Sequence, residues 1–235
     1  MDTEIEEAAA YAARLIVDQH CSWALARTKL TEAFGKRCPM PSGADVETAV
    51  REHLSIFYPD HPALLAALRA EAAAVMRDLA EAGITAYLAG PVLNGAATDD
   101  SNITLECFAE SGKDAELALL NLNINWEPID PQATPSLHPI EALGWLRPIR
   151  RGSPLSRLLP FAHSVGVSLE VLPLRDLGAN PRKRAPDIYQ TDIEASGRAS
   201  LDDLLSLLRA EPCVCQNTPI FPLPSTAVRV RCRAL

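Results

Sequence analysis

Residues 84–105 read ITAYLAGPVLNGAATDDSNITL, and the pattern of this stretch decides the fold class. An apolar strand pattern ends at Gly90, and a second strand pattern begins near Asn102. Between them lie small and polar residues, namely Gly90, Asn94, Gly95, Ala96, Ala97, Thr98, Asp99 and Asp100. Small side chains let a backbone approach a phosphate closely, and carboxylates stand beside that point. The stretch therefore predicts two strands joined by a turn that is a candidate binding site.

Apolar residues recur at helical spacing in four segments before this stretch, over residues 4–17, 22–34, 44–57 and 60–83. Ser22, Ser42 and Asp60 fit the N-cap positions of the last three helices. Gly35 and Gly83 fit the ends of the second and the fourth helix. The side chains of these segments, histidines included, are expected to form helical core.

After this stretch the sequence predicts, in order, a strand over 102–109, a helix over 112–122, a short strand over 125–129, an irregular loop over 128–139, a hairpin with strands at 158–164 and 167–172, a surface segment over 175–198 and a helix over 201–208. Alternation along the first of these strands puts Asn102, Thr104 and Glu106 on one face. Ser111 and Ser200 fit the N-caps of the two helices.

The chain has 235 residues, of which 48% are hydrophobic, and this is enough to bury a sizeable core. The order of elements predicts an α/β protein in which a helical N-terminal region packs on a small mixed β-sheet. Three regions are expected: a helical region over 1–60, an α/β domain over 61–209 and an extended or disordered tail over 210–235. The tryptophans Trp23, Trp126 and Trp145 are expected in the core or at an interface.

The formal net charge of -8 at pH 7 argues against a chain-wide nucleic-acid-binding surface. Basic residues gather in two local clusters, which comprise Arg147, Arg150, Arg151 and Arg157 in one and Arg175, Arg182, Lys183 and Arg184 in the other. Each cluster is interpreted as a solvated loop, with a local anion site as the alternative. Nucleic acid is therefore not an expected partner.

The N-terminus, MDTEIEEAAAYAARL, is acidic and lacks an apolar core, so neither a signal peptide nor a transit peptide is expected. No apolar run is long enough to span a bilayer, so no membrane partner is expected. Six cysteines are scattered too widely for the framework of a small secreted domain, which favours a cytoplasmic location. A zinc site at Cys213, Cys215 and Cys232 is set aside, because the spacing is not C-x-x-C and no histidine lies nearby.

The run from Gly90 to Leu105 resembles the signature G-S-x-A-R-G-x-A-x-x-x-S-D-I-D-L of minimal members of the nucleotidyltransferase superfamily, which share a DNA polymerase beta-like fold. The positions that match without a gap are Gly90, Gly95, Ala97, Ser101, Ile103 and Leu105. The phrase LAGPVLNGAATDDSNITLECFAES is also similar to a group of bacterial proteins predicted to be nucleotidyltransferases. That likeness covers residues 13–208.

The resemblance implies a metal-dependent transfer of a nucleotidyl group from a nucleoside triphosphate to an acceptor. In this superfamily two acidic residues on one strand and a third on a neighbouring strand hold a divalent metal such as Mg²⁺. The two paired positions are Asn102 and Thr104 here, and Glu170 matches the third. The serine of the phosphate-binding Gly-Ser is Pro91, which has neither a hydroxyl nor a backbone donor.

The catalytic candidates are Asp100, Asn102, Thr104 and Glu170, and the metal candidates among them are Asp100, Asn102 and Glu170. If the strand begins early, Asp100 shares the face of Asn102 and Thr104 and can join Glu106 and Glu170 in a displaced acidic cluster. The alternative is that Asp99 and Asp100 are turn residues that bond to their own backbone. The candidates for the phosphate cradle are Gly90, Pro91, Asn94 and Gly95.

Two functions stay open at this point. The first is a nucleotidyltransferase-family protein with a degraded or rearranged metal site. The second is a catalytically inactive protein of the same fold that binds a nucleotide or another protein. The replacements at Pro91, Asn102 and Thr104 favour the second, because an amide or a hydroxyl cannot supply the charge that draws a dication out of water.

Overall fold

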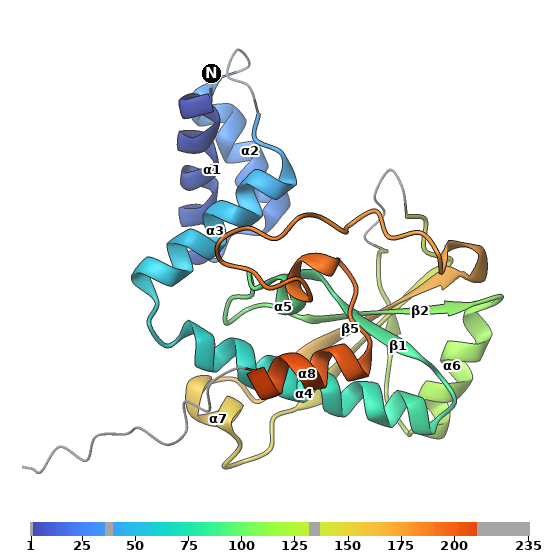
Figure 1. The fold of residues 1–235 in the computed structure, drawn as a ribbon. Coiled ribbons are helices and arrows are strands. Elements are labelled where there is room, and N and C mark those ends of the chain that lie inside the picture. The colour runs from blue at the N-terminus through green and yellow to red at the C-terminus, as the bar shows by residue number, and fades with distance from the viewer. Residues whose placement is uncertain (1, 36–39, 132–136, 211–235) are drawn as a thin grey trace, which may run out of the picture.

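The computed structural model describes residues 2–35, 40–131 and 137–210 (Figure 1). Within these ranges the chain forms eight α-helices and one five-stranded mixed sheet, so the expected α/β class is confirmed. The tail was expected over 210–235; Ala210 ends the last helix, and residues 211–235, with Cys213, Cys215 and Cys232, lie outside the described residues. Among the helices that the structure describes, none is long and apolar enough to cross a bilayer.

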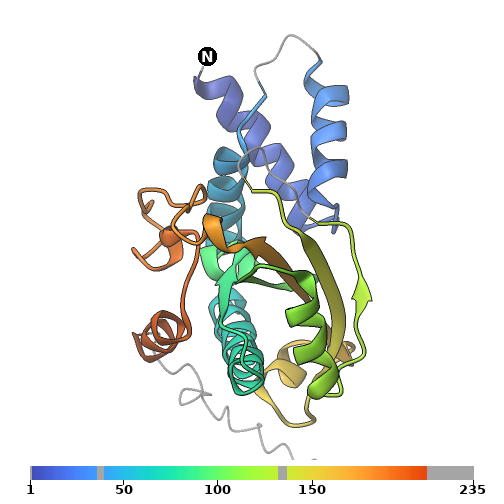
Figure 2. The ribbon, with the colours of Figure 1, turned by 90° about the vertical axis from the view of Figure 1, so that its right-hand side faces the viewer.

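The first three helices stand together at one end of the molecule (Figures 1 and 2), and they are α1 (Asp2–Val17), α2 (Trp23–Phe34) and α3 (Gly43–Phe57). The expected N-caps are confirmed: the Ser22 side chain accepts from the Leu25 amide, and Ser42 forms a reciprocal capping box with Asp45. Their inner faces form a buried cluster of their own, centred on residues such as Ala13 and Val50.

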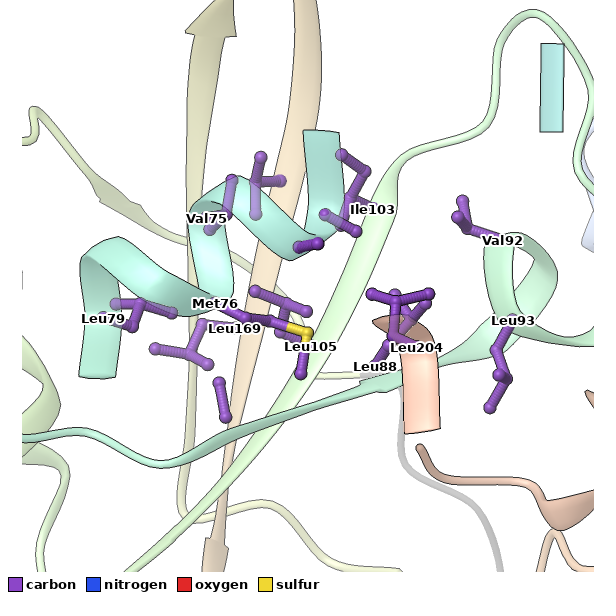
Figure 3. Packing of buried hydrophobic residues seen from close by; sticks show 14 of the residues in the cluster. Val75, Met76, Leu79, Leu88, Val92, Leu93, Ile103, Leu105, Leu169 and Leu204 are labelled. Carbon is purple, nitrogen blue, oxygen red and sulfur yellow. The ribbon is translucent and has the colours of Figure 1, made fainter. Parts of the chain in front are cut away.

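The long helix α4 (His61–Glu81) lies along one face of the sheet (Figures 1 and 3). Asp60 does precede it, but its side chain makes no capping hydrogen bond to the described helix. The reason is its backbone: Asp60 has ψ -6°, whereas a capping side chain is presented from an extended conformation. The helix ends before Gly83, which has φ +88°.

The sheet has the order β1-β2-β5-β4-β3, and its strands are β1 (Ala86–Ala89), β2 (Ile103–Ala109), β3 (Glu127–Pro128), β4 (Glu141–Pro148) and β5 (Ser164–Pro173). β2 and β5 pair in parallel and the other neighbours pair antiparallel. The remaining helices are α5 (Gly90–Asn94), α6 (Gly112–Asn121), α7 (Pro154–Leu158) and α8 (Leu201–Ala210). Short 3-10 turns cover Leu174–Asp176 and Glu194–Ser196.

The predicted hairpin over 158–172 is wrong. Ser153 caps the short helix α7, and β5 runs straight through the position where a turn was expected. Gly166 is not a turn residue: it lies inside β5, and a Cβ there would collide with the side chain of Asn102. The antiparallel partner of β5 is β4, for which the sequence analysis assigned no strand.

The main core lies between α4 and the sheet (Figure 3). The side chains that meet there include Val75, Met76, Leu79, Leu88, Ile103, Leu105, Leu169 and Leu204. Trp145 is buried beside them, as expected for a core tryptophan. The opposite face of β2 is buried as well: Thr104 is 7% exposed and Glu106 is 1% exposed. We call residues 177–199, which cover this second face, the strap.

Candidate functional site

A cavity of about 920 Å³ lies where the N-terminal helices, α5, the start of β2 and the strap meet. Six candidate residues from the sequence line it, and they are Gly90, Pro91, Asn94, Asp100, Asn102 and Thr104. Within the part of the chain that the structure describes, the cavity lining does not include Gly95 or Glu170. The stretch that was singled out in the sequence therefore forms one wall of a cavity large enough for a small-molecule ligand.

The turn after β1 is a short helix, not the irregular glycine turn that was expected. Gly90 begins α5 with φ +70°, and a Cβ on it would lie 3.3 Å from the Cβ of Thr104. Gly90 therefore allows α5 to pack directly on β2. Pro91 lies in the first turn of the helix, where its missing N–H costs no hydrogen bond.

The end of α5 is held by its own contacts. Gly95 has φ +86°, and its N–H donates to the Pro91 carbonyl over 3.1 Å. The Asn94 side chain accepts from the Ala96 amide over 2.9 Å, and the Asn94 carbonyl accepts from Gln190 Nε2 over 2.8 Å. Asn94 thus positions α5 against the strap, and whether it also touches a phosphate stays a prediction.

Polar residues form three rows across the parallel pair β2 and β5. Asn102 lies over Gly166, Thr104 is paired with Ser168, and Glu106 is paired with Glu170. The Ser168 hydroxyl donates to Thr104 Oγ1 over 3.4 Å. The rows that line the cavity therefore carry an amide and hydroxyls, while the carboxylates lie one row deeper.

The two carboxylates of the deep row are neutralised by arginines of the strap. Glu106 and Glu170 are 1% and 2% exposed. Arg182 forms ion pairs with both of them, through Nη1 to Glu106 and through Nη2 to Glu170 over 3.4 Å. Arg198 adds a bond from Nε to Glu106 Oε2 of 2.7 Å. Two guanidinium groups thus balance two carboxylates inside the protein.

The structure does not bring Asp100 to these carboxylates. β2 begins at Ile103, so Asp100 lies in the preceding turn, where its side chain is 68% exposed. His20 Nδ1 lies 2.7 Å from Asp100 Oδ2 and 3.5 Å from Asp99 Oδ1. The backbone of this turn is bonded by the Ser101 hydroxyl, which accepts from the Thr98 amide over 2.8 Å. The displaced cluster of Asp100, Glu106 and Glu170 is therefore wrong.

The residues at the expected metal position do not fit Mg²⁺. The cation prefers charged oxygen ligands, but Asn102 and Thr104 are neutral and Glu170 is already paired with Arg182. Elsewhere in the described chain, the group of potential ligands whose atoms lie within 4.8 Å of one another is His20, Asp99 and Asp100. This group is exposed, and exposed acidic groups of this kind are common without a metal.

The strap is attached to the helices by further ion pairs. Arg51 of α3 donates from Nη2 to Asp187 over 2.6 Å, and the buried Arg69 of α4 donates to Glu194 over 2.6 Å. Burial alone would raise the pKa of Asp187, but hydrogen bonds from Arg51 and the Tyr189 amide hold it below its ordinary value. Burial raises the pKa of Glu47, which also lines the cavity, despite the nearby arginines.

Two arginines that were expected in solvated loops form ion pairs with carboxylates of other elements. Arg182 was assigned to a solvated loop, yet it reaches the buried carboxylates of β2 and β5. Arg147 was assigned in the same way, but it belongs to β4 and binds Glu71 and Asp78 of α4 over 2.5 and 2.8 Å. The sequence gives no local signal for such pairs, because the partners are far apart along the chain.

Comparisons of this chain with protein-family models, with curated proteins and with solved structures find no match in any of the three. The resemblance to nucleotidyltransferases therefore rests on the sequence motif alone.

Trp23 is a lining residue that was expected in the core or at an interface. It is 42% exposed on the cavity wall and is therefore not a core residue. It is the first residue of α2, directly after the N-cap, and the inner positions of that helix are taken by Ala26 and Leu30. An exposed indole at a cavity wall offers a flat surface for a planar ligand group.

Proposed function

We propose that this chain binds a nucleotide in the cavity without metal-dependent transfer of its nucleotidyl group. The observation that carries the proposal is the neutralisation of Glu106 and Glu170 by Arg182 and Arg198 beneath a cavity lined by the candidate motif. A carboxylate that is already balanced by a guanidinium group has little to gain from a dication. The proposal thus follows the second of the two functions that the sequence left open.

The lining supports a nucleotide for reasons of size and chemistry. A volume of about 920 Å³ lies within the range of small-molecule sites. The Trp23 indole can stack on a base, and Asn102, Thr48 and Gln190 offer hydrogen-bonding groups to a sugar and to base edges. Stacking does not depend on charge, so this part of the site works without a metal.

The charges of the lining favour a short phosphate chain. The acidic lining residues are Glu47, Asp100, Asp187 and Glu194, and the arginines are Arg51, Arg182 and Arg184. Each of these arginines already faces a carboxylate. A triphosphate would add negative charge next to acidic groups, so a nucleoside monophosphate is expected to bind more tightly than a triphosphate.

Isothermal titration calorimetry with AMP, GMP, CMP, UMP and ATP, each in EDTA and in Mg²⁺, tests this proposal. At least one monophosphate should bind in EDTA, with a change in tryptophan fluorescence. Trp23→Ala should weaken that binding by about 10-fold, since a stacked base is worth roughly 1–3 kcal/mol. Trp126→Phe is the control, because Trp126 packs against the core and is not part of the cavity lining. Absence of binding by every nucleotide would refute the proposal.

Metal-dependent nucleotidyl transfer is the second candidate, and one observation favours it: Asp100 and Asn102 line the same cavity as Pro91 and Asn94. The test is incubation with labelled nucleoside triphosphates, Mg²⁺ or Mn²⁺ and cell extract. Label transfer that requires metal and disappears in Asp100→Ala would favour this candidate over metal-independent binding.

A further inference from the structure

A second cavity, of about 320 Å³, is lined in part by Thr98 and Asp99 of the turn before β2. Its walls come from the ends of α1 and α3, the start of α4 and the end of α7. It shares His20 and Thr98 with the first cavity, but its other lining residues are different. It plays no part in the nucleotide proposal.

One part of this second cavity is apolar. The side chains of Val17, Leu54, Leu64, Leu158 and Leu159 line it. Val17 and Leu54 are buried, so this wall is held in place by the packing of α1 on α3. A volume of about 320 Å³ equals roughly ten water molecules at ~30 Å³ each, which suits a ligand with one small ring or branched chain.

The polar part offers hydrogen-bond acceptors. The Tyr58 hydroxyl donates to Asp18 Oδ1 over 2.8 Å, so its oxygen retains only lone pairs, and His53 Nε2 contacts the same Asp18 oxygen over 2.9 Å. Burial would raise the pKa of Asp18, but these bonds from His53 and Tyr58 hold it below its ordinary value. Asp18 is therefore a carboxylate at neutral pH, and Oδ2 accepts from no other described residue.

His61 adds a further acceptor. Its Nε2 lies 2.8 Å from the Ala97 carbonyl, and a carbonyl can only accept, so the proton is on Nε2. Burial lowers the pKa of His61, and the charge of Arg69 acts in the same direction against the effect of the Ala97 bond. The ring is therefore neutral at pH 7, and its Nδ1 carries a lone pair.

The net charge of the lining also favours a ligand that donates hydrogen bonds. Three carboxylates, those of Asp18, Asp60 and Asp99, belong to the lining, and among the described residues no lysine or arginine does. His20 contacts Asp99 at the edge that the two cavities share. A ligand that matches this lining has a positively charged group with several N–H donors for the acceptors and an apolar body for the leucine side chains.

We propose that this second cavity is a binding site for a small primary amine with an apolar body, whose ammonium group is held by the carboxylates of the lining. An ammonium group carries three donors and no acceptor, which matches a wall of acceptors. The ring or branched chain replaces water against Leu54, Leu64 and Leu158. This site is separate from the nucleotide proposal and does not depend on it.

Three probes with the same phenyl body test the chemistry: 2-phenylethylamine, 2-phenylethanol and 3-phenylpropanoate. Binding to the full chain is followed by amide NMR shifts at pH 7. The amine should shift amides of residues 17–20, 54–61 and 97–99. The alcohol should bind about 10-fold more weakly, because a charge-assisted bond is roughly twice as strong as a neutral one. The acid should bind least, because its carboxylate is repelled by the carboxylates of the lining. Equal binding of amine and acid, or absence of amine binding, would overturn the proposal.

Two variants separate the polar groups from the fold. Asp99→Asn removes a charge from an exposed side chain and should weaken amine binding several-fold with little change in alcohol binding. Leu64→Trp fills the cavity and should weaken both. Asp202→Asn is the matched control, because Asp202 is an exposed residue of α8 outside the lining. Amine binding that survives both Asp99→Asn and Leu64→Trp would place the ligand elsewhere and contradict the proposal.

Discussion

The two faces of the sheet are covered in physically different ways. On one face α4 packs through fully buried apolar side chains such as Leu79 and Leu105. On the other face the strap is attached through charged pairs, which join Arg182 and Arg198 to Glu106. Apolar packing is non-directional and is not screened by salt in the way that charges are, whereas an ion pair weakens with ionic strength and needs both partners in place. The α4 face therefore gives the fold its stability, and the strap face is where a local change in charge has its effect.

The largest expected effect comes from the α4 face. Leu79→Ala removes a side chain that is 0% exposed, and it should lower the free energy of unfolding by about 2–5 kcal/mol. Urea unfolding followed by circular dichroism measures this. Leu117→Ala, on a residue of α6 that is 58% exposed, is the control and should change stability by less than about 0.5 kcal/mol. Similar losses for the two variants would contradict an apolar core beneath α4.

A smaller effect is expected on the strap face. Glu106→Gln keeps the shape but removes the charge that Arg182 and Arg198 share, and leaving their bonds poorly satisfied should cost about 1–3 kcal/mol. Hydrogen exchange should rise in the strap, for example at the Arg184 amide that donates to the Ala195 carbonyl, more than in α4. Glu110→Gln, on an exposed neighbour, is the control. Uniform faster exchange over the whole chain would show that the strap is not a separate unit.

The smallest expected effect is on the pH dependence of the free energy of unfolding, through Asp187 of the strap. The pKa of Asp187 is held below its ordinary value, so this carboxylate stabilises the fold above its unfolded pKa of about 3.9 and loses that effect as pH falls through the folded value. Between pH 6 and about pH 3, the wild type should therefore lose slightly more stability than Asp187→Asn, by less than about 1 kcal/mol. Asp192→Asn, at an exposed strap position, should follow the wild type. Parallel curves for wild type and Asp187→Asn would exclude a role for the Arg51 contact.

Local chemistry predicted much of this fold. The serines that begin α2 and α3 and the strand patterns around Gly90 are readable from neighbouring residues, and the structure contains those elements. β4 was not predicted. The strand predicted over 167–172 does lie in β5, but its start was missed, because Gly166 signals a turn in isolation and becomes a strand residue only where Asn102 lies over it. That contact joins distant segments, and no sequence window contains it.

The candidate site was also predicted in part. The motif residues do line one cavity, since their places follow from the strand and turn that carry them. The arginines that decide its charge could not be assigned, because Arg182 lies 76 residues from Glu106 and Arg198 lies 92 residues from it. Their contacts depend on the path of the strap. The catalytic and metal roles of Asp100, Asn102, Thr104 and Glu170 stay predictions.

The first residues of the strap also contact its last residues. Asn180 Nδ2 donates to the Ser196 carbonyl over 2.7 Å, and Gly197, with φ +77°, lies against the backbone of Arg182 where a side chain would not fit. The segment between them is thus a closed loop whose ends meet at a single carboxylate, Glu106. Closing a loop costs entropy that grows only slowly with loop length, so the contacts inside the loop form between segments that closure has already brought together. The strap should therefore open cooperatively as one unit, without fraying from either end.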